Sequence, residues 1–207
     1  MDLPLPISVC GMDEAGRGPL AGPIVAASVL LIRPFAEFQA HSGCIVRDSK
    51  CLSVSKREQI YVALTDQYAQ VVTETIDVPE INEYGIGWAN KELFIRLIQK
   101  TDASSYIIDG NLKVTVAQKN IRSVVDADAT IKEVMLAGNI AKVTRDHMMS
   151  AYAKQYPEYG WDHNAGYGTR GHIEAILKYG ITPYHRIQFV KSALSHASNN
   201  EKISHMV

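Results

Sequence analysis

The longest apolar run in the chain, residues 24–32, restricts the fold more than any other feature of the sequence. It is far too short to cross a bilayer as a helix, which takes about 20 apolar residues. Its apolar residues do not alternate with polar ones, as they do in a strand with one face in water. The run therefore predicts a strand covered on both faces, in the middle of a β-sheet.

Patterns on either side of this run predict further strands and helices. Ser55 and Glu58, for example, have the spacing of a capping box at the start of a helix. We expect strands at residues 7–12, 70–77, 106–110 and 123–128. We expect helices at residues 55–68, at 79–100 with a break near Gly85 and Gly87, at 131–156 and at 169–179.

The order of these elements predicts an α/β fold, with a mixed sheet flanked by helices and a small helical extension after it. Strands come first, then strands alternating with helices, and finally mostly helices. We expect the sheet domain at residues 1–150, the helical extension at 151–195 and a flexible polar tail at 196–207.

Composition limits the class of protein. The 207 residues are 46% hydrophobic and 21% charged, as in ordinary globular domains. A net charge of −1 gives no overall basic field, so a nucleic-acid partner must be bound by a local patch. The three cysteines lack CxxC spacing, which argues against a zinc site or a disulfide framework and fits a reducing compartment. The N-terminus has no basic region of a signal peptide, so we expect a cytoplasmic protein with no membrane partner.

Carboxylates follow three of the predicted strands at the point where each strand ends. Asp13 and Glu14 follow the first, Asp109 ends another, and Asp126 and Asp128 end a third. Several buried carboxylates are unfavourable together unless a cation compensates them, and hard divalent ions prefer such oxygen ligands. If the strand ends adjoin, these acids predict a metal site that acts on a phosphate. Single acids at such positions are often turn formers or helix caps, and the pattern alone leaves both interpretations open.

An ordered set of short motifs resembles the ribonuclease HII family. The first and most specific motif is DEAGRGPLAG at residues 13–22. The other motifs follow in the family's order and extend the resemblance over about residues 9–191: Asp48-Ser49-Lys50 with Leu52-Ser53, Ile108-Asp109-Gly110, IAKVTRD at residues 140–146, Gly166-Tyr167-Gly168-Thr169, and His185-Arg186.

The resemblance implies a ribonuclease H-like fold whose C-terminal helical extension binds substrate. It implies an endoribonuclease that needs Mg²⁺ or Mn²⁺ and hydrolyses the RNA strand of RNA–DNA hybrids. It also implies incision on the 5′ side of single ribonucleotides in duplex DNA, by two-metal-ion hydrolysis that leaves 3′-hydroxyl and 5′-phosphate ends. The family's roles are ribonucleotide excision repair and DNA replication, and we expect a monomer. The implied metal ligands and catalytic residues are Asp13, Glu14, Asp109 and Asp128.

The fourth of these acids is implied by its spacing. The family's last acid lies eighteen residues before the final Asp of the motif that ends here at Asp146, which indicates Asp128 and not Asp126. The sequence departs from the family at three places. The usual Lys-Gly, Ala-Ala-Ser-Ile and His-Lys are here Asp126-Ala127, Ala137-Gly138-Asn139-Ile140 and Asn164-Ala165.

The glycine-rich turn and one tyrosine are the features best suited to contact a ribose. Gly16-Arg17-Gly18 forms a turn whose backbone can approach a sugar closely, because glycine has no Cβ. In the family this turn recognises the 2′-hydroxyl. Tyr167 lies between two glycines, which leave its ring free to pack on a sugar with its hydroxyl near the 2′-OH. An ordinary hairpin turn and a tyrosine that anchors a loop are the structural alternatives.

Basic residues near the motifs are candidate phosphate contacts, since most contacts that position a protein on a duplex go to phosphates. Lys50 is the strongest of these candidates, and a solvated surface charge is the alternative for each. The other candidates are Arg145, Arg170, Arg186 and Lys191. Lys142, one helical turn before Asp146 and able to pair with it, is a candidate substrate contact. The histidines lack metal-ligand spacing, so His172 and His185 are expected to be surface or packing residues.

Two other classes of protein remain as alternatives to the nuclease. A nucleic-acid-binding module on the same fold would lack activity, yet the chain retains all the matched acids. A sugar-phosphate enzyme would be expected to carry a phosphate loop of the form GxxxxGK[ST], which this sequence does not contain. Metal-dependent cleavage of an RNA–DNA hybrid distinguishes the nuclease from both.

Overall fold

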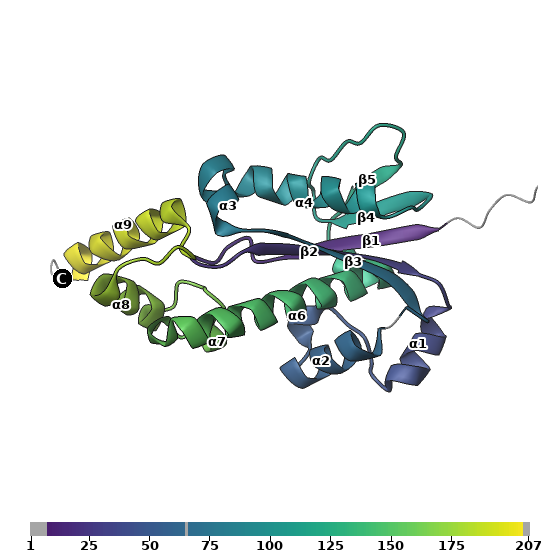
Figure 1. Cartoon of the computed structure of the whole chain (residues 1–207), viewed down its shortest axis with the longest axis horizontal. Helices are drawn as coiled ribbons and strands as arrows, with labels where there is room; N and C mark the ends of the chain where they lie inside the picture. The colour runs from purple at the N-terminus through teal and green to yellow at the C-terminus, as the bar shows by residue number, and fades with distance from the viewer. Residues whose placement is uncertain (1–7, 65, 205–207) are drawn as a thin grey trace, which may run out of the picture. The chain divides into compact units, whose positions relative to one another are not determined.

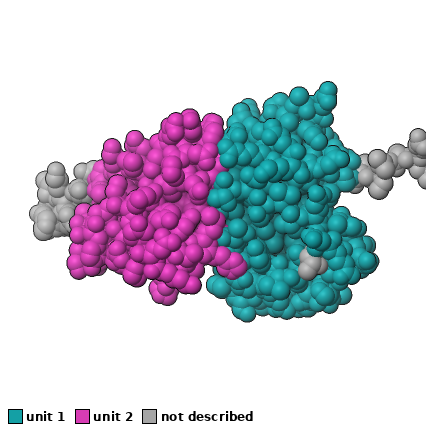
Figure 2. All heavy atoms as spheres, in the orientation of Figure 1, with its two compact units in different colours: residues 1–15, 25–75, 90–144 teal, residues 16–24, 76–89, 145–207 magenta. Residues whose placement is uncertain are grey.

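A computed structural model describes residues 8–64 and 66–204, except the side chains of Lys50 and of residues 196–204. The chain forms two compact units, which Figure 2 shows in different colours. Unit 1 consists of residues 1–15, 25–75 and 90–144, and unit 2 of residues 16–24, 76–89 and 145–207. Both units are therefore built from segments that are distant in the sequence.

A five-stranded sheet is the main element of unit 1 in the described part of the chain, with the strand order β3-β2-β1-β4-β5. The strands are β1 (Val9–Ala15), β2 (Ile24–Leu31), β3 (Ala69–Ile76), β4 (Ser105–Asp109) and β5 (Ile121–Val124). β1 pairs antiparallel with β2 and parallel with β4, which in turn pairs parallel with β5. The predicted mixed sheet is confirmed, and the apolar run forms β2, an internal strand whose first six residues are buried.

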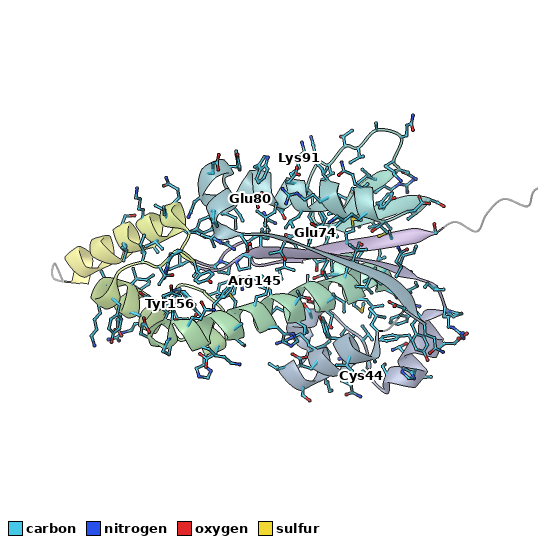
Figure 3. The ribbon with its side chains drawn as sticks, viewed as in Figure 1. Cys44, Glu74, Glu80, Lys91, Arg145 and Tyr156 are labelled. Atoms are coloured by element: carbon cyan, nitrogen blue, oxygen red, sulfur yellow. The ribbon has the colours of Figure 1, made fainter. Side chains whose placement is uncertain are left out.

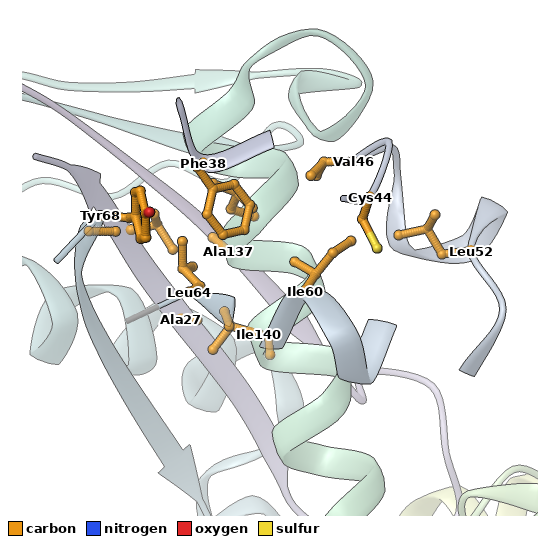
Figure 4. Packing of buried hydrophobic residues seen from close by; sticks show 14 of the residues in the cluster. Ala27, Phe38, Cys44, Val46, Leu52, Ile60, Leu64, Tyr68, Ala137 and Ile140 are labelled. Atoms are coloured by element: carbon orange, nitrogen blue, oxygen red, sulfur yellow. The ribbon is translucent and has the colours of Figure 1, made fainter. Parts of the chain in front are cut away.

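Helices cover both faces of this sheet (Figure 1). α4 (Ile86–Lys100) lies on one face, and α1 (Phe35–Ser42), α2 (Val54–Ala63) and α6 (Lys132–Gln155) lie on the other. Ala27 of β2 belongs to one buried cluster with Phe38 of α1, Ile60 of α2, and Ala137 and Ile140 of α6 (Figure 4). Burial of this apolar surface fixes the first half of α6 on the sheet.

β1 and α6 lie in backbone contact. A Cβ atom on Gly11 of β1 would lie 2.3 Å from the carbonyl carbon of Glu133 and from the nitrogen of Val134, so only glycine permits this approach. Asp13 is the next residue of β1 on the same face, since side chains alternate along a strand. The contact at Gly11 therefore brings Asp13 against α6.

Unit 2 consists of helices and loops around a second apolar cluster. Its elements are α3 (Val78–Tyr84), the last part of α6, η2 (Pro157–Tyr159), α7 (Trp161–Asn164), α8 (Arg170–Tyr179) and α9 (Ile187–Ser204). Leu20 from the glycine-rich segment packs with Met149, Tyr159 and Trp161 in this cluster. The Tyr159 and Trp161 rings stack with their centroids 5.1 Å apart. The segment at residues 16–24 is thus anchored to helices from the C-terminal part of the chain.

Two predicted strands have different ends in the structure. β1 continues through Asp13 and Glu14, because these residues pair with Ala27 and Ala26 of β2. The strand predicted at residues 123–128 is wrong beyond Val124, where β5 ends. Asp126 has a φ of +56°, a left-handed conformation that a strand cannot continue through, and α5 (Ala127–Thr130) follows it.

The ends of the predicted helices agree better with the structure than those of the strands. The break near Gly85 is confirmed, since α3 ends at Tyr84 and Gly85 has a φ of +83°. The helix predicted at residues 55–68 ends earlier, at Ala63. α1 and the short 3-10 turn η1 (Ser49–Cys51) were not predicted.

The division expected near residue 150 also differs from the observed units. Unit 2 begins at Arg145, inside α6, and includes residues 16–24 and 76–89. α9 extends to Ser204, through most of the segment expected to be a flexible tail, and residues 205–207 lie outside the described residues. Among the described residues, no helix is both long enough and apolar enough to cross a bilayer.

Candidate active site

Acidic side chains gather at one edge of the sheet in unit 1. β1, β4 and β5 are parallel, so their carboxyl ends meet at the same edge. Asp109 ends β4, and Asp13 follows directly after Met12, which pairs with Ile108 of β4. The N–H of Asp128, in α5, donates to Asp109 Oδ1 over 3.2 Å. The structure thus brings acids from three separate segments of the sequence together.

These carboxylates are close enough to perturb one another. Burial and the neighbouring charge of Glu14, with smaller contributions from Asp109 and Asp128, raise the pKa of Asp13 to about 8. One opposing contribution comes from the Glu14 N–H, which donates to Asp13 Oδ1 over 2.7 Å. The ionised form of Asp13 is therefore destabilised by the surroundings that the protein itself provides.

The chemistry of this donor set fits a hard divalent cation. Asp13, Glu14, Asp109 and Asp128 offer only carboxylate oxygens, and a cation among them would offset the repulsion that raises the pKa of Asp13. As the described side chains stand, no three His, Cys, Asp or Glu residues are arranged to hold one ion. The acids therefore suit Mg²⁺ or Mn²⁺, and some of them must turn to reach a common ion.

The two candidates for the fourth acid lie in different surroundings. Asp128 is 7% exposed and contributes to the raised pKa of Asp13. Asp126 is exposed and precedes α5. The structure places Asp128, the residue indicated by spacing, with the other acids.

In unit 2, Arg186 supports the glycine-rich turn from its buried side. Its Nε, Nη1 and Nη2 atoms donate to the carbonyl oxygens of Gly22, Arg17 and Gly16 at 2.9, 3.0 and 2.7 Å. The side chain is completely buried, and this burial together with the charge of Arg145 lowers the pKa of Arg186 to about 9. Arg186 was expected to contact phosphate, but in the structure its guanidinium is occupied by the backbone of the turn.

Arg145 of α6 binds the same segment at other points (Figure 3). Its Nε, Nη1 and Nη2 atoms donate to the carbonyl oxygens of Pro23, Ala165 and Ala21 at 2.9, 2.8 and 3.0 Å. It is 1% exposed, so it too departs from the expected phosphate contact. Gly16 has a φ of +99°, and a Cβ there would lie 2.2 Å from Arg145 Nε. The positive φ and the position of Arg145 therefore require glycine at position 16.

The bonds of Arg186 determine which way the peptides of the turn face. In a trans peptide, the C=O and the following N–H point in opposite directions. The carbonyls of Gly16 and Arg17 both point to Arg186, so the N–H groups of Arg17 and Gly18 point away from it. Arg17 and Gly18 are exposed. The turn therefore presents two neighbouring donors toward its exposed side.

Tyr167 lies beside this turn, within the same unit. Its side chain is 47% exposed, and a Cβ on Gly18 would lie 3.7 Å from Tyr167 Cε1. The loop that carries Tyr167 is bound to the turn by the amides of Leu20 and Ala21, which donate to Gly166 O at 2.8 and 3.2 Å. An exposed aromatic ring and two backbone donors thus lie next to each other, as contact with a sugar requires.

A buried pair of histidines holds the Tyr167 loop from inside. His172 Nδ1 lies 2.9 Å from Tyr167 O, so this nitrogen carries the hydrogen, and Nε2 accepts from Trp161 Nε1–H over 3.0 Å. His172 Nε2 also lies 3.2 Å from Nε2 of His185, whose Nδ1 accepts from the Thr182 N–H over 2.9 Å. Burial lowers the pKa of both histidines, to about 4 for His185, which keeps them neutral near pH 7.

The sequence interpretation of His172 and His185 as surface or packing residues missed this positioning role. The sequence does not show that His172 is buried and accepts a hydrogen bond from Trp161, so the role could not be read from it. The one available signal was that His185 directly precedes Arg186 in a family motif.

The remaining basic candidates are less informative. Lys142 is half-buried on α6, in unit 1. Lys50 lies in η1, and its side chain lies outside the described part of the structure. Arg170 is exposed and pairs with Glu174 over 2.7 Å, and Lys191 is exposed. Phosphate contacts by Lys50, Arg170 and Lys191, and substrate contacts by Arg17 and Lys142, stay predictions.

Comparison with known proteins links this arrangement to one family. A family profile described as Ribonuclease HII matches residues 10–192. The chain is 39% identical over 191 residues to a ribonuclease HII of Clostridium acetobutylicum, covering 91% of this chain and 74% of the relative. It is 39% identical over 193 residues to the ribonuclease HII of Orientia tsutsugamushi strain Ikeda, covering 92% of this chain and 90% of the relative.

Solved structures show the same fold. The ribonuclease H2 of Pyrococcus horikoshii matches with a TM-score of 0.74 at 23% identity, covering 92% of this chain and 98% of that one. The structure of Bst-RNase HIII in complex with Mn²⁺ matches with a TM-score of 0.71 at 20% identity, covering 93% of this chain and 71% of that one. The predicted ribonuclease H-like fold is therefore confirmed.

Proposed function

Because the chain belongs to the ribonuclease HII family, we propose that it incises duplex DNA on the 5′ side of single embedded ribonucleotides as well as cleaving RNA–DNA hybrids. It is a ribonuclease H, a nuclease that hydrolyses phosphodiester bonds, and its family supports endoribonuclease activity on RNA–DNA hybrids. Enzymes of this family depend on divalent metal ions. The use of Mg²⁺ or Mn²⁺ by this chain, in a two-metal-ion mechanism, is part of the proposal.

The observation that carries the proposal is the group of carboxylates at the carboxyl ends of β1 and β4. Asp13, Glu14, Asp109 and Asp128 would hold the ions, which when bound activate a water and stabilise the leaving oxygen. The N–H of Asp128 orients the Asp109 carboxylate through its bond to Oδ1. Hydrolysis of the phosphodiester bond on the 5′ side of the ribonucleotide leaves a 3′-hydroxyl and a 5′-phosphate.

Selection of ribose is assigned to the residues of unit 2. The N–H groups of Arg17 and Gly18 face the exposed side of the turn, where they can donate to a ribose 2′-oxygen or a phosphate. The Tyr167 ring can pack on the sugar beside Gly18, with its hydroxyl near the 2′-OH. Because Ala15 and Gly16 are consecutive, the chain connects the acids directly to this turn.

The remaining parts of the proposal concern the substrate backbone and the setting of the reaction. We expect Lys50 to contact a phosphate, since such contacts position a protein on a duplex, and Lys142 and Arg17 to contact the substrate. We expect the protein to act as a monomer in the cytoplasm, in ribonucleotide excision repair and replication, as the family resemblance implies.

An inactive nucleic-acid-binding module is the competing function. The acids argue against it, because clustered carboxylates repel a phosphate backbone and raise the pKa of Asp13 unless cations are present. A binding module would gain nothing from retaining them.

Cleavage of two labelled substrates tests the proposal. One is an RNA–DNA hybrid, and the other is duplex DNA with a single ribonucleotide; each is incubated with Mg²⁺, with Mn²⁺ or with chelator. We expect cleavage of both only with metal, and an incision 5′ of the ribonucleotide whose 3′ end a polymerase can extend. The Asp109→Asn variant is the control and should bind the substrates without cleaving them. Binding without cleavage by the parent protein, in either metal, would support the binding module instead.

A further inference from the structure

Gly138 of α6 leaves a space that the Asp13 carboxylate fills. The three atoms nearest to a Cβ built on Gly138 all belong to Asp13: Oδ2 at 2.3 Å, Cγ at 3.4 Å and Cβ at 3.7 Å. Both residues belong to unit 1. The absent side chain of Gly138 is therefore what allows the carboxylate to lie directly against the helix.

Only the far end of Asp13 stands in the way of a larger residue at position 138. Contacts of 3.4 and 3.7 Å to Cγ and Cβ are ordinary, so only the terminal oxygen must move, and the terminal torsion of Asp is broad. Gly11 of β1 is the opposite case, because an added Cβ there would meet the backbone of α6 at 2.3 Å. A side chain at position 138 would thus turn the carboxylate, whereas one at position 11 would separate the strand from the helix.

The helix itself is not free to yield. Ala137 and Ile140, on either side of Gly138 in the sequence, pack in the buried cluster of unit 1 with residues of β2, α1 and α2 (Figure 4). Shifting α6 would open that cluster, which costs more than turning one carboxylate.

Both oxygens of Asp13 are engaged in this arrangement. Oδ1 accepts from the Glu14 N–H over 2.7 Å, and Oδ2 lies in the space at Gly138. We propose that Gly138 is a positioning residue for Asp13, which holds the carboxylate against α6 and thereby weakens the binding of a divalent cation by the acids of unit 1. The identity of the ligand as a divalent cation rests on the proposed function, but the packing of Asp13 on Gly138 does not.

Thermal unfolding without metal tests the packing through four proteins: the parent, Gly138→Ala, Asp13→Ala and the double variant. Alanine is the better helix former, and Gly138→Ala in the Asp13→Ala background should raise the unfolding midpoint by roughly 2–4 °C. In the parent background the rise should be smaller or absent, because the carboxylate is displaced. Gly87→Ala in α4 is the matched control, since nothing lies within 4 Å of its added Cβ.

Calorimetric titration with Mn²⁺ tests the consequence for metal binding. In Gly138→Ala the carboxylate no longer has to leave the helix to reach an ion, so part of the reorganisation is already complete. We expect Mn²⁺ to bind roughly fivefold more tightly than to the parent, which corresponds to about 1 kcal/mol. Gly87→Ala should bind Mn²⁺ as the parent does.

The results that would overturn the role of Gly138 differ from those that would overturn the proposed function. Equal rises of the midpoint in both backgrounds, a fall in the Asp13→Ala background, or unchanged Mn²⁺ affinity in Gly138→Ala would each overturn the proposal for Gly138. If neither the parent nor Gly138→Ala binds Mn²⁺, the proposed function fails and so does the assigned effect on metal, while the four-protein comparison still decides whether Gly138 positions Asp13.

Discussion

The acids of unit 1 and the glycine-rich turn of unit 2 differ in how their charges and polar groups are compensated. The acids repel one another, as the raised pKa of Asp13, about 8, indicates. By contrast, two buried arginines donate to five backbone carbonyls of the segment at residues 16–24 and to one of the Tyr167 loop. The difference indicates that the protein alone preorganises the turn, whereas the acids stay unfavourable together until the proposed cation binds.

The largest effect in this comparison is expected from removing an acid. Asp109→Asn should reduce turnover of an RNA–DNA hybrid by at least about 100-fold, since even residues that only support metal ligands are often worth 10–100-fold. Asp128→Asn should cause a much larger loss than Asp126→Asn, because only Asp128 is buried and raises the pKa of Asp13. Steady-state kinetics of the three variants measure this, and a larger loss in Asp126→Asn would contradict the assignment of the fourth acid.

The turn should respond through stability. Arg186→Lys keeps a positive charge but loses the guanidinium that serves three carbonyls, and we expect the free energy of unfolding to fall by about 3 kcal/mol. Arg170→Lys, at an exposed ion pair, should leave it nearly unchanged. Urea unfolding of both variants checks the contrast, and similar changes in the two would show that the turn is not organised by Arg186.

Tyr167 separates recognition of ribose from hydrolysis. Tyr167→Ala should lose roughly 1–3 kcal/mol of substrate positioning, because it removes a ring contact and one hydrogen bond. The loss should be greater on duplex DNA with one ribonucleotide than on a continuous hybrid, which offers many alternative registers. Tyr167→Phe, which retains the ring, is the control. Equal losses on both substrates would indicate that Tyr167 supports only the fold.

The pH dependence of stability in the metal-free protein examines the acids alone. Asp13 has a raised pKa, so its protonated form stabilises the fold at low pH, and this contribution is lost as pH rises from about 4 to about 8. Asp13→Asn removes the dependence. Its free energy of unfolding, relative to the parent, should therefore increase by roughly 4 kcal/mol between pH 5 and pH 8. A difference that stays constant across this range would show that Asp13 is not destabilised by its surroundings.

The acids and the turn also differ in how far the sequence predicts them. Asp13 and Asp109 were identified as strand-end carboxylates because a strand and the acid that ends it are adjacent in the chain. Hydrophobic pattern, another local signal, predicted the apolar run that forms β2. The strand prediction failed at residues 125–128, because β5 ends before Asp126, whose positive φ no local signal marks.

The roles of the buried arginines could not be obtained in this way. Arg186 binds Gly16 across 170 residues of sequence, and Arg145 binds Pro23 across 122. From sequence alone, a basic residue in a motif resembles a phosphate contact, because nothing local indicates that its partners are backbone carbonyls. The role of His172 and His185 was missed for a different reason. Their partners are near in the sequence, but the sequence does not show that the two rings are buried against each other and against Trp161 and the Tyr167 loop.

Hydrogen–deuterium exchange with and without Mg²⁺ tests the central contrast most directly. In the metal-free protein, we expect the amides of residues 17–23 to be protected already wherever they are bonded, and Mg²⁺ to leave their exchange unchanged. Residues 12–15, 108–110 and 126–130, which carry the acids, should exchange more slowly once Mg²⁺ is added, because the ion relieves their repulsion. Protection that appears in the turn and not around the acids would contradict the account.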